Sequence, residues 1–154
     1  MHPILFPYSM FSQKPSTVTP REQLHTDLTE KIIGSAIKVH TILGPGFDED
    51  IYTNALIVEF QKNGLTFENN WQIKVYYDAI NLGTYSVDFL VQDKVIIKVM
   101  ATEHLEPKYL YQVKSHLAAS GLKVGLVLNF GNATLEIKRV EPRVLKDRER
   151  VTKK

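Results

Sequence analysis

The chain has 154 residues, a formal net charge of +2, 44% apolar residues and no cysteine. This length suits one domain with a sizeable core, and the lack of cysteine excludes disulfides, thiolate zinc sites and cysteine nucleophiles. The small net charge does not by itself indicate a nucleic-acid partner. No apolar run reaches the roughly 18 residues of a membrane span, and the first residues lack the features of a signal peptide. We therefore expect a cytoplasmic protein with no membrane partner.

Residues 1–25 contain four prolines and show no helical period, so we expect a flexible N-terminal arm there. Residues 27–30 (DLTE) have the pattern of a capping box, which predicts the start of a helix. Apolar residues at helical spacing continue to Leu43, and residues 44–46 (GPG) end the helix. His40 lies near this end, where we expect a buried or capping histidine rather than a catalytic one.

A second helix is predicted from about Asp48 to Asn63. Its acidic first turn suits the positive end of the helix dipole, which is a sufficient structural reason for acids there. Its buried face is expected to consist of apolar residues at helical spacing, namely Ile51, Ala55, Leu56 and Val58.

Three strands are expected next. Residues 71–77 alternate in polarity, and turn residues at 78–83 indicate an antiparallel return. Residues 86–91 and 95–99 then form a hairpin whose turn is Gln92-Asp93. Because side chains alternate along a strand, two sets of residues should each share a face: Val87, Phe89 and Val91 on the first strand, and Ile96, Lys98 and Met100 on the second.

A third helix opens at Glu106-Pro107 and closes at Gly121, with a core stripe beside a more polar stripe of Tyr109, Gln112 and His116. Residues 123–130 form a nearly continuous apolar run, as in a strand covered on both faces, and residues 134–140 alternate like an edge strand. The predicted order is helix, helix, three strands, helix, two strands. We expect one α/β domain at 26–141 and a charged C-terminal tail at 142–154. The main core is predicted to contain Val95, Ile97, Val99, Leu126 and Leu128.

One heptapeptide, residues 46–52 (GFDEDIY), matches a GxxExxY motif, and further matching segments follow in order through residues 87–91 and 120–130. The chain resembles the GxxExxY family of small bacterial proteins, a branch of the PD-(D/E)XK nuclease superfamily, over roughly residues 28–140. This resemblance implies a restriction-endonuclease-like mixed sheet flanked by helices. It also implies Mg²⁺-dependent hydrolysis of nucleic-acid phosphodiesters.

The resemblance further implies a site made of a helix acid, a strand aspartate, an E-x-K motif on the next strand and a polar residue of the third helix. Glu49, Asp88 and Gln112 match three of these positions. Lys98-Val99-Met100 stands where E-x-K is expected, so a lysine replaces the ligand glutamate and a methionine replaces the lysine. Glu49 and Asp88 would be the metal ligands if a metal binds.

Mg²⁺ prefers hard oxygen ligands, and a protonated lysine offers no lone pair. We therefore expect a catalytically inactive protein without a cofactor, in which Lys98 pairs with Asp88 and Glu49, since an uncompensated buried acid pair is costly. Retained nucleic-acid or protein binding stays open. One alternative is an active Mg²⁺-dependent nuclease in which Glu103 or Asp93 supplies the missing ligand. Another is a homo-oligomeric interaction module, for example a homodimer.

Overall fold

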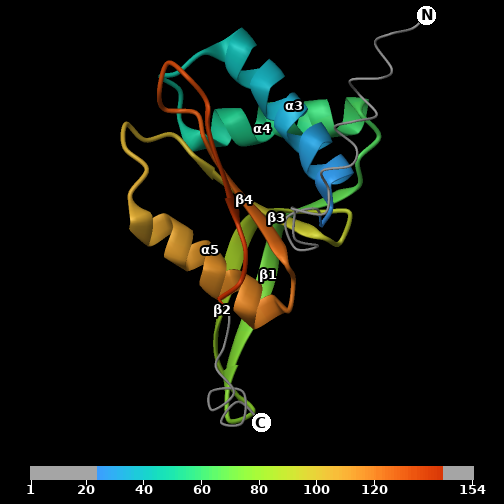
Figure 1. Cartoon of the computed structure of the whole chain (residues 1–154), viewed down its shortest axis with the longest axis vertical. Helices are drawn as coiled ribbons and strands as arrows, with labels where there is room; N and C mark the ends of the chain where they lie inside the picture. Colours follow the sequence, from blue (N-terminus) through green and yellow to red (C-terminus); the bar gives the residue numbers. More distant parts are fainter. Residues whose placement is uncertain (1–23, 144–154) are drawn as a thin grey trace, which may run out of the picture.

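The computed structural model describes residues 24–143 (Figure 1). Within this range the chain forms three helices and five strands: α3 (Thr26–Leu43), α4 (Glu49–Lys62), β1 (Phe67–Tyr77), β2 (Ile80–Val91), β3 (Val95–Met100), α5 (Pro107–Ser120), β4 (Val124–Asn129) and β5 (Glu136–Val140). The predicted order of elements is confirmed. The expected N-terminal arm and charged C-terminal tail lie almost wholly outside the described residues.

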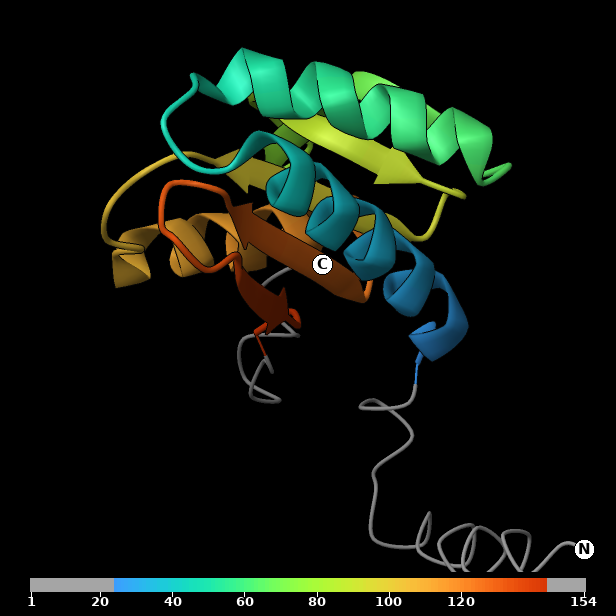
Figure 2. The same cartoon turned by 90° about the horizontal axis from the view of Figure 1, so that it is seen from above.

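The five strands form one sheet in the order β1-β2-β3-β4-β5. Strands β3 and β4 are parallel and all other neighbours are antiparallel. A parallel pair needs a crossover connection, and α5 supplies it. Helices α3 and α4 cover one face of the sheet while α5 packs on the other (Figure 2).

Alternate residues of β3 therefore enter two different cores. The larger cluster lies under α3 and α4 and contains all five predicted core residues, Val95, Ile97, Val99, Leu126 and Leu128. The smaller cluster lies under α5 and contains Ile96, Met100, Val113, Leu117 and Val127. The prediction of a strand covered on both faces is thus confirmed for Val124–Asn129, since every residue of β4 is buried, whereas Lys123 is exposed before the strand begins.

The start of α3 differs from the prediction. The helix begins at Thr26 after His25, whose φ is 59°, and no side chain caps it, so the predicted capping box is wrong. The Thr29 hydroxyl instead donates to the carbonyl of Thr26 at 3.1 Å. Because the N-cap is His25, two residues before the predicted Asp27, Asp27 lies inside the first turn, where its charge faces the positive end of the dipole.

The end of α3 agrees with the prediction for His40. This histidine is buried, and its Nε2 lies 2.8 Å from the carbonyl oxygen of Asn132. Its own carbonyl accepts a hydrogen bond from the Gly44 amide at 2.8 Å. His40 therefore joins the helix end to the loop after β4.

Helix α4 is rotated relative to the prediction. Tyr52, Leu56 and Phe60 are fully buried, whereas Ile51 and Val58 are 43% and 51% exposed, so these two are wrongly assigned to the core. Both faces carry apolar residues at helical spacing, and the large aromatic side chains decide which one turns inward because they bury the most area. Ala55 packs against the core as a partly buried residue.

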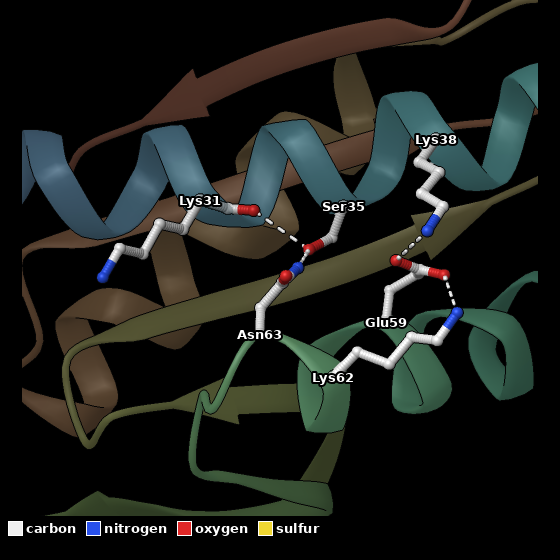
Figure 3. Close-up of polar contacts among 6 residues, drawn as sticks. All are labelled: Lys31, Ser35, Lys38, Glu59, Lys62 and Asn63. Carbon is white, nitrogen blue, oxygen red and sulfur yellow. Dashed lines mark hydrogen bonds and ion pairs between the residues drawn. The ribbon is translucent and has the colours of Figure 1, made fainter.

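A polar seam joins α3 to α4 beside this core (Figure 3). Asn63 donates from Nδ2 to the Ser35 hydroxyl at 2.9 Å, and that hydroxyl donates to the Lys31 carbonyl. The nearly buried Glu59 carboxylate lies 3.4 Å from the ammonium of Lys38 and 3.7 Å from that of Lys62. These contacts satisfy the buried polar groups and fix the pairing of the two helices.

Asn129, the fully buried last residue of β4, fastens the segment that leaves β3. Its Oδ1 accepts from the amides of Thr102 at 2.9 Å and Gly131 at 3.1 Å. Its Nδ2 donates to the Thr102 carbonyl at 2.9 Å and to Glu136 Oε1 at 2.6 Å. The position at which the chain turns toward α5 is thereby fixed.

Candidate functional site

The candidate site begins where β2 changes the face that it presents. Phe89 and Val91 belong to the cluster under α3 and α4, but Val87 belongs to the cluster under α5. The predicted shared face is therefore wrong for Val87. The change coincides with Asn70 of β1, whose φ of 56° interrupts the ladder between the pairs Asn69↔Phe89 and Trp71↔Val87. The missing pair between Asn70 and Asp88 marks the point at which the regular alternation of side chains along the hairpin is interrupted.

Asp88 lies at this irregularity. Its side chain, rather than its backbone, makes the hydrogen bond to β3 at this position. The paired positions of β2 and β3 run from Val91↔Val95 to Phe89↔Ile97 and include no partner for Asp88. Its Oδ2 accepts a hydrogen bond from the Val99 amide at 2.6 Å. Its own carbonyl accepts from Nδ2 of Asn69 at 2.9 Å. The carboxyl group is therefore held between the two strands.

The pKa of Asp88 is raised, chiefly because burial penalises the charged carboxylate. The Val99 hydrogen bond and the positive charge of Lys98 act in the opposite direction, and the negative charge of Asp50 raises the pKa further. Asp50 neighbours Glu49 in the first turn of α4. The helix acid whose charge reaches Asp88 is thus Asp50.

Lys98 lies on the α5 face of β3, between Ile96 and Met100, as predicted. Its ammonium lies 5.9 Å from the centre of the Tyr109 ring of α5, which is within the range of a cation–π contact. Among the described residues, no ion pair joins Lys98 to Asp88 or Glu49. The expected pairing is therefore not formed as a direct contact, although the Lys98 charge still lowers the pKa of Asp88.

A small pocket of about 40 Å³ opens beside Asp88 and Lys98. It is lined from β2, β3 and α5, by Ser86, Val87, Asp88, Ile96, Ile97, Lys98, Val113 and His116. Burial lowers the pKa of His116, and the neighbouring Lys98 charge lowers it further. A space of this size accepts water and is far too small for a nucleotide.

The structure brings together only part of the predicted site. Glu49 is exposed on α4 and does not line the pocket. Gln112 is exposed on α5 and lines an adjoining hollow that shares His116 with the pocket. Met100, at the position expected for a lysine, is buried at 3% exposure in the apolar cluster under α5.

Neither alternative ligand lies at the pocket. Asp93 is exposed in the turn between β2 and β3, and Glu103 is exposed in the segment after β3. Within residues 24–143 no group of three or more histidine, aspartate or glutamate side chains is arranged to hold a metal. Asp88 offers one carboxylate, and that carboxylate faces a lysine and an amide donor. These residues do not fit Mg²⁺, which needs several hard oxygen ligands.

Three residues of the site were not assigned to it from the sequence. Tyr109 and His116 belong to the predicted polar stripe of α5, so their helical spacing was the available signal. Asp50 was ascribed only to the helix dipole, and its adjacency to Glu49 was the only signal for a further role.

Two residues of the GxxExxY heptapeptide have structural roles. Tyr52 stacks on Phe130 with ring centres 4.6 Å apart and planes at 12°. Its hydroxyl donates to the Gly44 carbonyl at 2.5 Å and accepts from the Phe47 amide at 3.2 Å. Gly46 has a φ of 117°, which side chains rarely permit. Gly46 and Tyr52 thus build the turn between α3 and α4.

The chain is similar in fold to solved structures that have little sequence in common with it. A crystal structure of SSO0001 superposes with a TM-score of 0.51 at 12% identity, covering 86% of this chain and 65% of that one. The chain thus spans slightly less than two thirds of that structure. An alkaline exonuclease, LHK-Exo, from Laribacter hongkongensis has a TM-score of 0.43 at 13% identity, covering 75% of this chain and 82% of that one. The same exonuclease in complex with dAMP gives 0.43 at 13% identity, with coverage of 70% and 76%.

No curated protein matches the chain in sequence. In the part of the chain that the structure describes, no helix is long and apolar enough to cross a membrane. Residues 26–140, which comprise every helix and strand described above, match the PD-(D/E)XK nuclease superfamily. This match covers most of the chain, and the mixed sheet flanked by helices agrees with it. The chain therefore belongs to the PD-(D/E)XK nuclease superfamily.

Proposed function

We propose that this chain is a GxxExxY-type nuclease-fold protein that has lost metal-dependent hydrolysis and retains nucleic-acid binding. The observation that carries the loss of hydrolysis is the pair of residues on β3. Lys98 faces the pocket from the position of the metal-ligating glutamate, and Met100 lies buried where a lysine would contact phosphate. Asp88 is the remaining strand acid, and its pKa is raised by burial.

Electrostatics opposes a metal ion at this position. Two unit charges about 4 Å apart repel by about 4 kcal/mol at an effective dielectric constant of 20, and a divalent ion doubles that figure. Met100 provides neither a proton donor nor a cation for a phosphate, so neither part of the E-x-K function is supplied.

Retained nucleic-acid binding is supported by the superfamily and by the charge of the surface beside the pocket. Lys108 of α5 is exposed in the hollow that shares His116 with the pocket, and Lys114 of the same helix is exposed in a further hollow that adjoins the first. Exposed lysines on one face provide a sequence-independent attraction for phosphates. We infer that the scaffold still meets a phosphate backbone on the α5 face.

The test is a double reversion, Lys98→Glu with Met100→Lys, compared with the natural sequence. Titration calorimetry with Mn²⁺ and Mg²⁺ should detect binding only in the revertant, and plasmid cleavage should follow the same pattern. Lys31→Gln is a matched control, because it lowers the net charge by one, as the double reversion does, but on the exposed face of α3. It should behave like the natural sequence in both assays.

A different result would contradict the proposal. If the natural protein binds Mn²⁺ and cleaves plasmid, and Asp88→Ala abolishes the cleavage, then hydrolysis has not been lost. In that case an active nuclease with a relocated ligand such as Glu103 would be the better description.

A homodimeric interaction module is the second candidate. It is favoured by apolar side chains at the turn between β1 and β2, where Ile80 and Leu82 are 64% and 63% exposed. Exposed apolar groups that cluster in this way often mark contact surfaces. Sedimentation velocity should show a dimer that Ile80→Asp with Leu82→Asp converts to a monomer if this candidate is right.

A further inference from the structure

A groove runs between α5 and the β1–β2 hairpin and leads to the pocket of Asp88. It consists of two adjoining hollows of about 540 and 400 Å³ that share Val75 and Tyr111 among their lining residues. His116 lines both the second hollow and the Asp88 pocket, so the spaces adjoin. Hollows of this size are typical of sites for nucleotide-sized groups.

Three tyrosines from three different elements line this groove. Tyr76 of β1 and Tyr85 of β2 are each 58% exposed, and Tyr111 of α5 is 65% exposed. Large aromatic rings left this open lose the stabilisation that burial would give them. The Tyr85 ring lies 5.2 Å from that of His116, which holds it against the inner end of the groove.

The charges that line the groove have one sign. Lys108, Lys114 and Arg143 line it, and no aspartate or glutamate does. All three cations are exposed. Lys108 lies 5.2 Å from the Tyr109 ring and 4.0 Å from Glu106, a weak surface pair, while Lys114 forms no ion pair within residues 24–143. The groove thus suits an extended polyanion.

We propose that this groove binds single-stranded nucleic acid, with unpaired bases stacked on Tyr76, Tyr85 and Tyr111 and the backbone phosphates near Lys108, Lys114 and Arg143. This inference rests on one part of the proposed function, the binding of nucleic acid, and does not depend on the loss of hydrolysis. Every base has a face on which an aromatic ring can stack, and stacking with cationic contacts characterises sequence-tolerant single-strand binding. In a duplex those faces are covered by neighbouring base pairs, so exposed rings select the unpaired strand.

Fluorescence anisotropy with a labelled 12-nucleotide mixed-sequence oligonucleotide and its 12-base-pair duplex tests the proposal on the full chain. The single strand should bind about tenfold or more tightly than the duplex, since one or more stacked bases are lost in the duplex. Tyr111→Ala should weaken single-strand binding by about 5-fold or more, whereas Tyr111→Phe should retain it because the ring remains. Equal weakening by the two changes would overturn stacking.

Matched controls separate the groove from the rest of the surface. Tyr77→Ala removes a tyrosine that is 68% exposed outside the groove, and it should leave binding unchanged. Three phosphate contacts at about 0.7 each predict a slope of about −2 for log K against log salt, and Lys114→Gln should reduce its size by about 0.7. Lys31→Gln on the opposite side of the sheet should leave the slope unchanged. The same series with an RNA oligonucleotide shows whether the groove prefers ribose or deoxyribose in the strand.

The outcomes also distinguish the two proposals. Equal affinity for single strand and duplex would overturn single-strand recognition while leaving nucleic-acid binding intact. No binding of either would overturn both. A Tyr77→Ala effect as large as that of Tyr111→Ala would place the binding surface outside the groove.

Discussion

The two faces of the sheet differ in the side chains that they present and in how completely the helices cover them. Under α3 and α4 the face is closed and apolar, and polar groups such as Glu59 and Asn63 lie at its border with their partners in place. Under α5 the same strands present a lysine, an acid with a raised pKa and a pocket beside His116. Consecutive residues of β3 thus point alternately into the closed core and toward the face that carries the candidate site. Side chains on the α5 face can therefore change while the closed face keeps the fold.

The largest effect is expected at Ile97, which is 1% exposed on the closed face. Ile97→Ala should lower the free energy of unfolding by about 2–5 kcal/mol, since a fully buried side chain leaves a cavity. Urea unfolding monitored by circular dichroism measures this. A change within experimental error of zero would mean that the face under α3 and α4 does not carry the stability.

Asn129 should show the next largest effect, because it satisfies two backbone groups of Thr102. Asn129→Ala would leave those part-buried groups without their present partner, at a cost of about 1–3 kcal/mol. The same urea assay applies, and Asn132→Ala is the matched control because its side-chain amide donates, within residues 24–143, only to the Glu136 carboxylate. Equal losses for the two changes would show that the Thr102 contacts contribute nothing specific.

Asp88→Asn should stabilise the protein near neutral pH. Such a gain would show that the charged carboxylate of Asp88 lowers the free energy of unfolding on the α5 face. Burial raises the pKa of Asp88 in the folded state, so the favourable contribution of its protonated form is present at low pH. That contribution is lost as the pH rises through the raised pKa. The melting temperature of the variant should therefore exceed that of the natural protein at pH 7, and the difference should shrink in acid. A difference that grows in acid would contradict the assignment.

The smallest effect on stability is expected from Lys98→Ala, because Lys98 forms no direct ion pair with Asp88. We expect a loss under about 1 kcal/mol, consistent with a partly exposed cation–π contact. The pKa of His116 should rise, since the Lys98 charge helps to lower it, and NMR titration of the imidazole signals measures this. An unchanged pKa of His116 would show that Lys98 points away from the pocket in solution.

The sequence predicted those parts of the fold that depend on periodicity. The order of elements, the turn at Gln92-Asp93 and the five core residues of β3 and β4 follow from apolar spacing and turn residues. The buried face of helix α4 was predicted wrongly because Ile51 and Tyr52 both begin apolar stripes. The choice between them depends on the area that the large aromatic side chains bury, as in the stacking of Tyr52 on Phe130. Spacing indicates that a face exists, and it fails where two faces compete.

The candidate site was less predictable because it depends on departures from regular structure. Asn70 adopts a left-handed conformation that glycine more commonly takes, and no local pattern signals it. The reach of Lys98 depends on side-chain rotation, and its Tyr109 contact joins separate elements. The tyrosines of the groove likewise come from β1, β2 and α5, so their proximity exists only after folding.

The position of Tyr52 affects how related chains would be found. Its ring and hydroxyl hold the turn after α3, and Gly46 provides the backbone freedom for that turn. Mutations in β3 leave both residues untouched, so selection on folding alone would preserve them after hydrolysis is lost. A sequence search that relies on Gly46 and Tyr52 therefore finds chains that share this turn, whether or not they hydrolyse anything. The residues that correspond to Lys98 and Met100 must be inspected before any chain found in this way is assigned an activity.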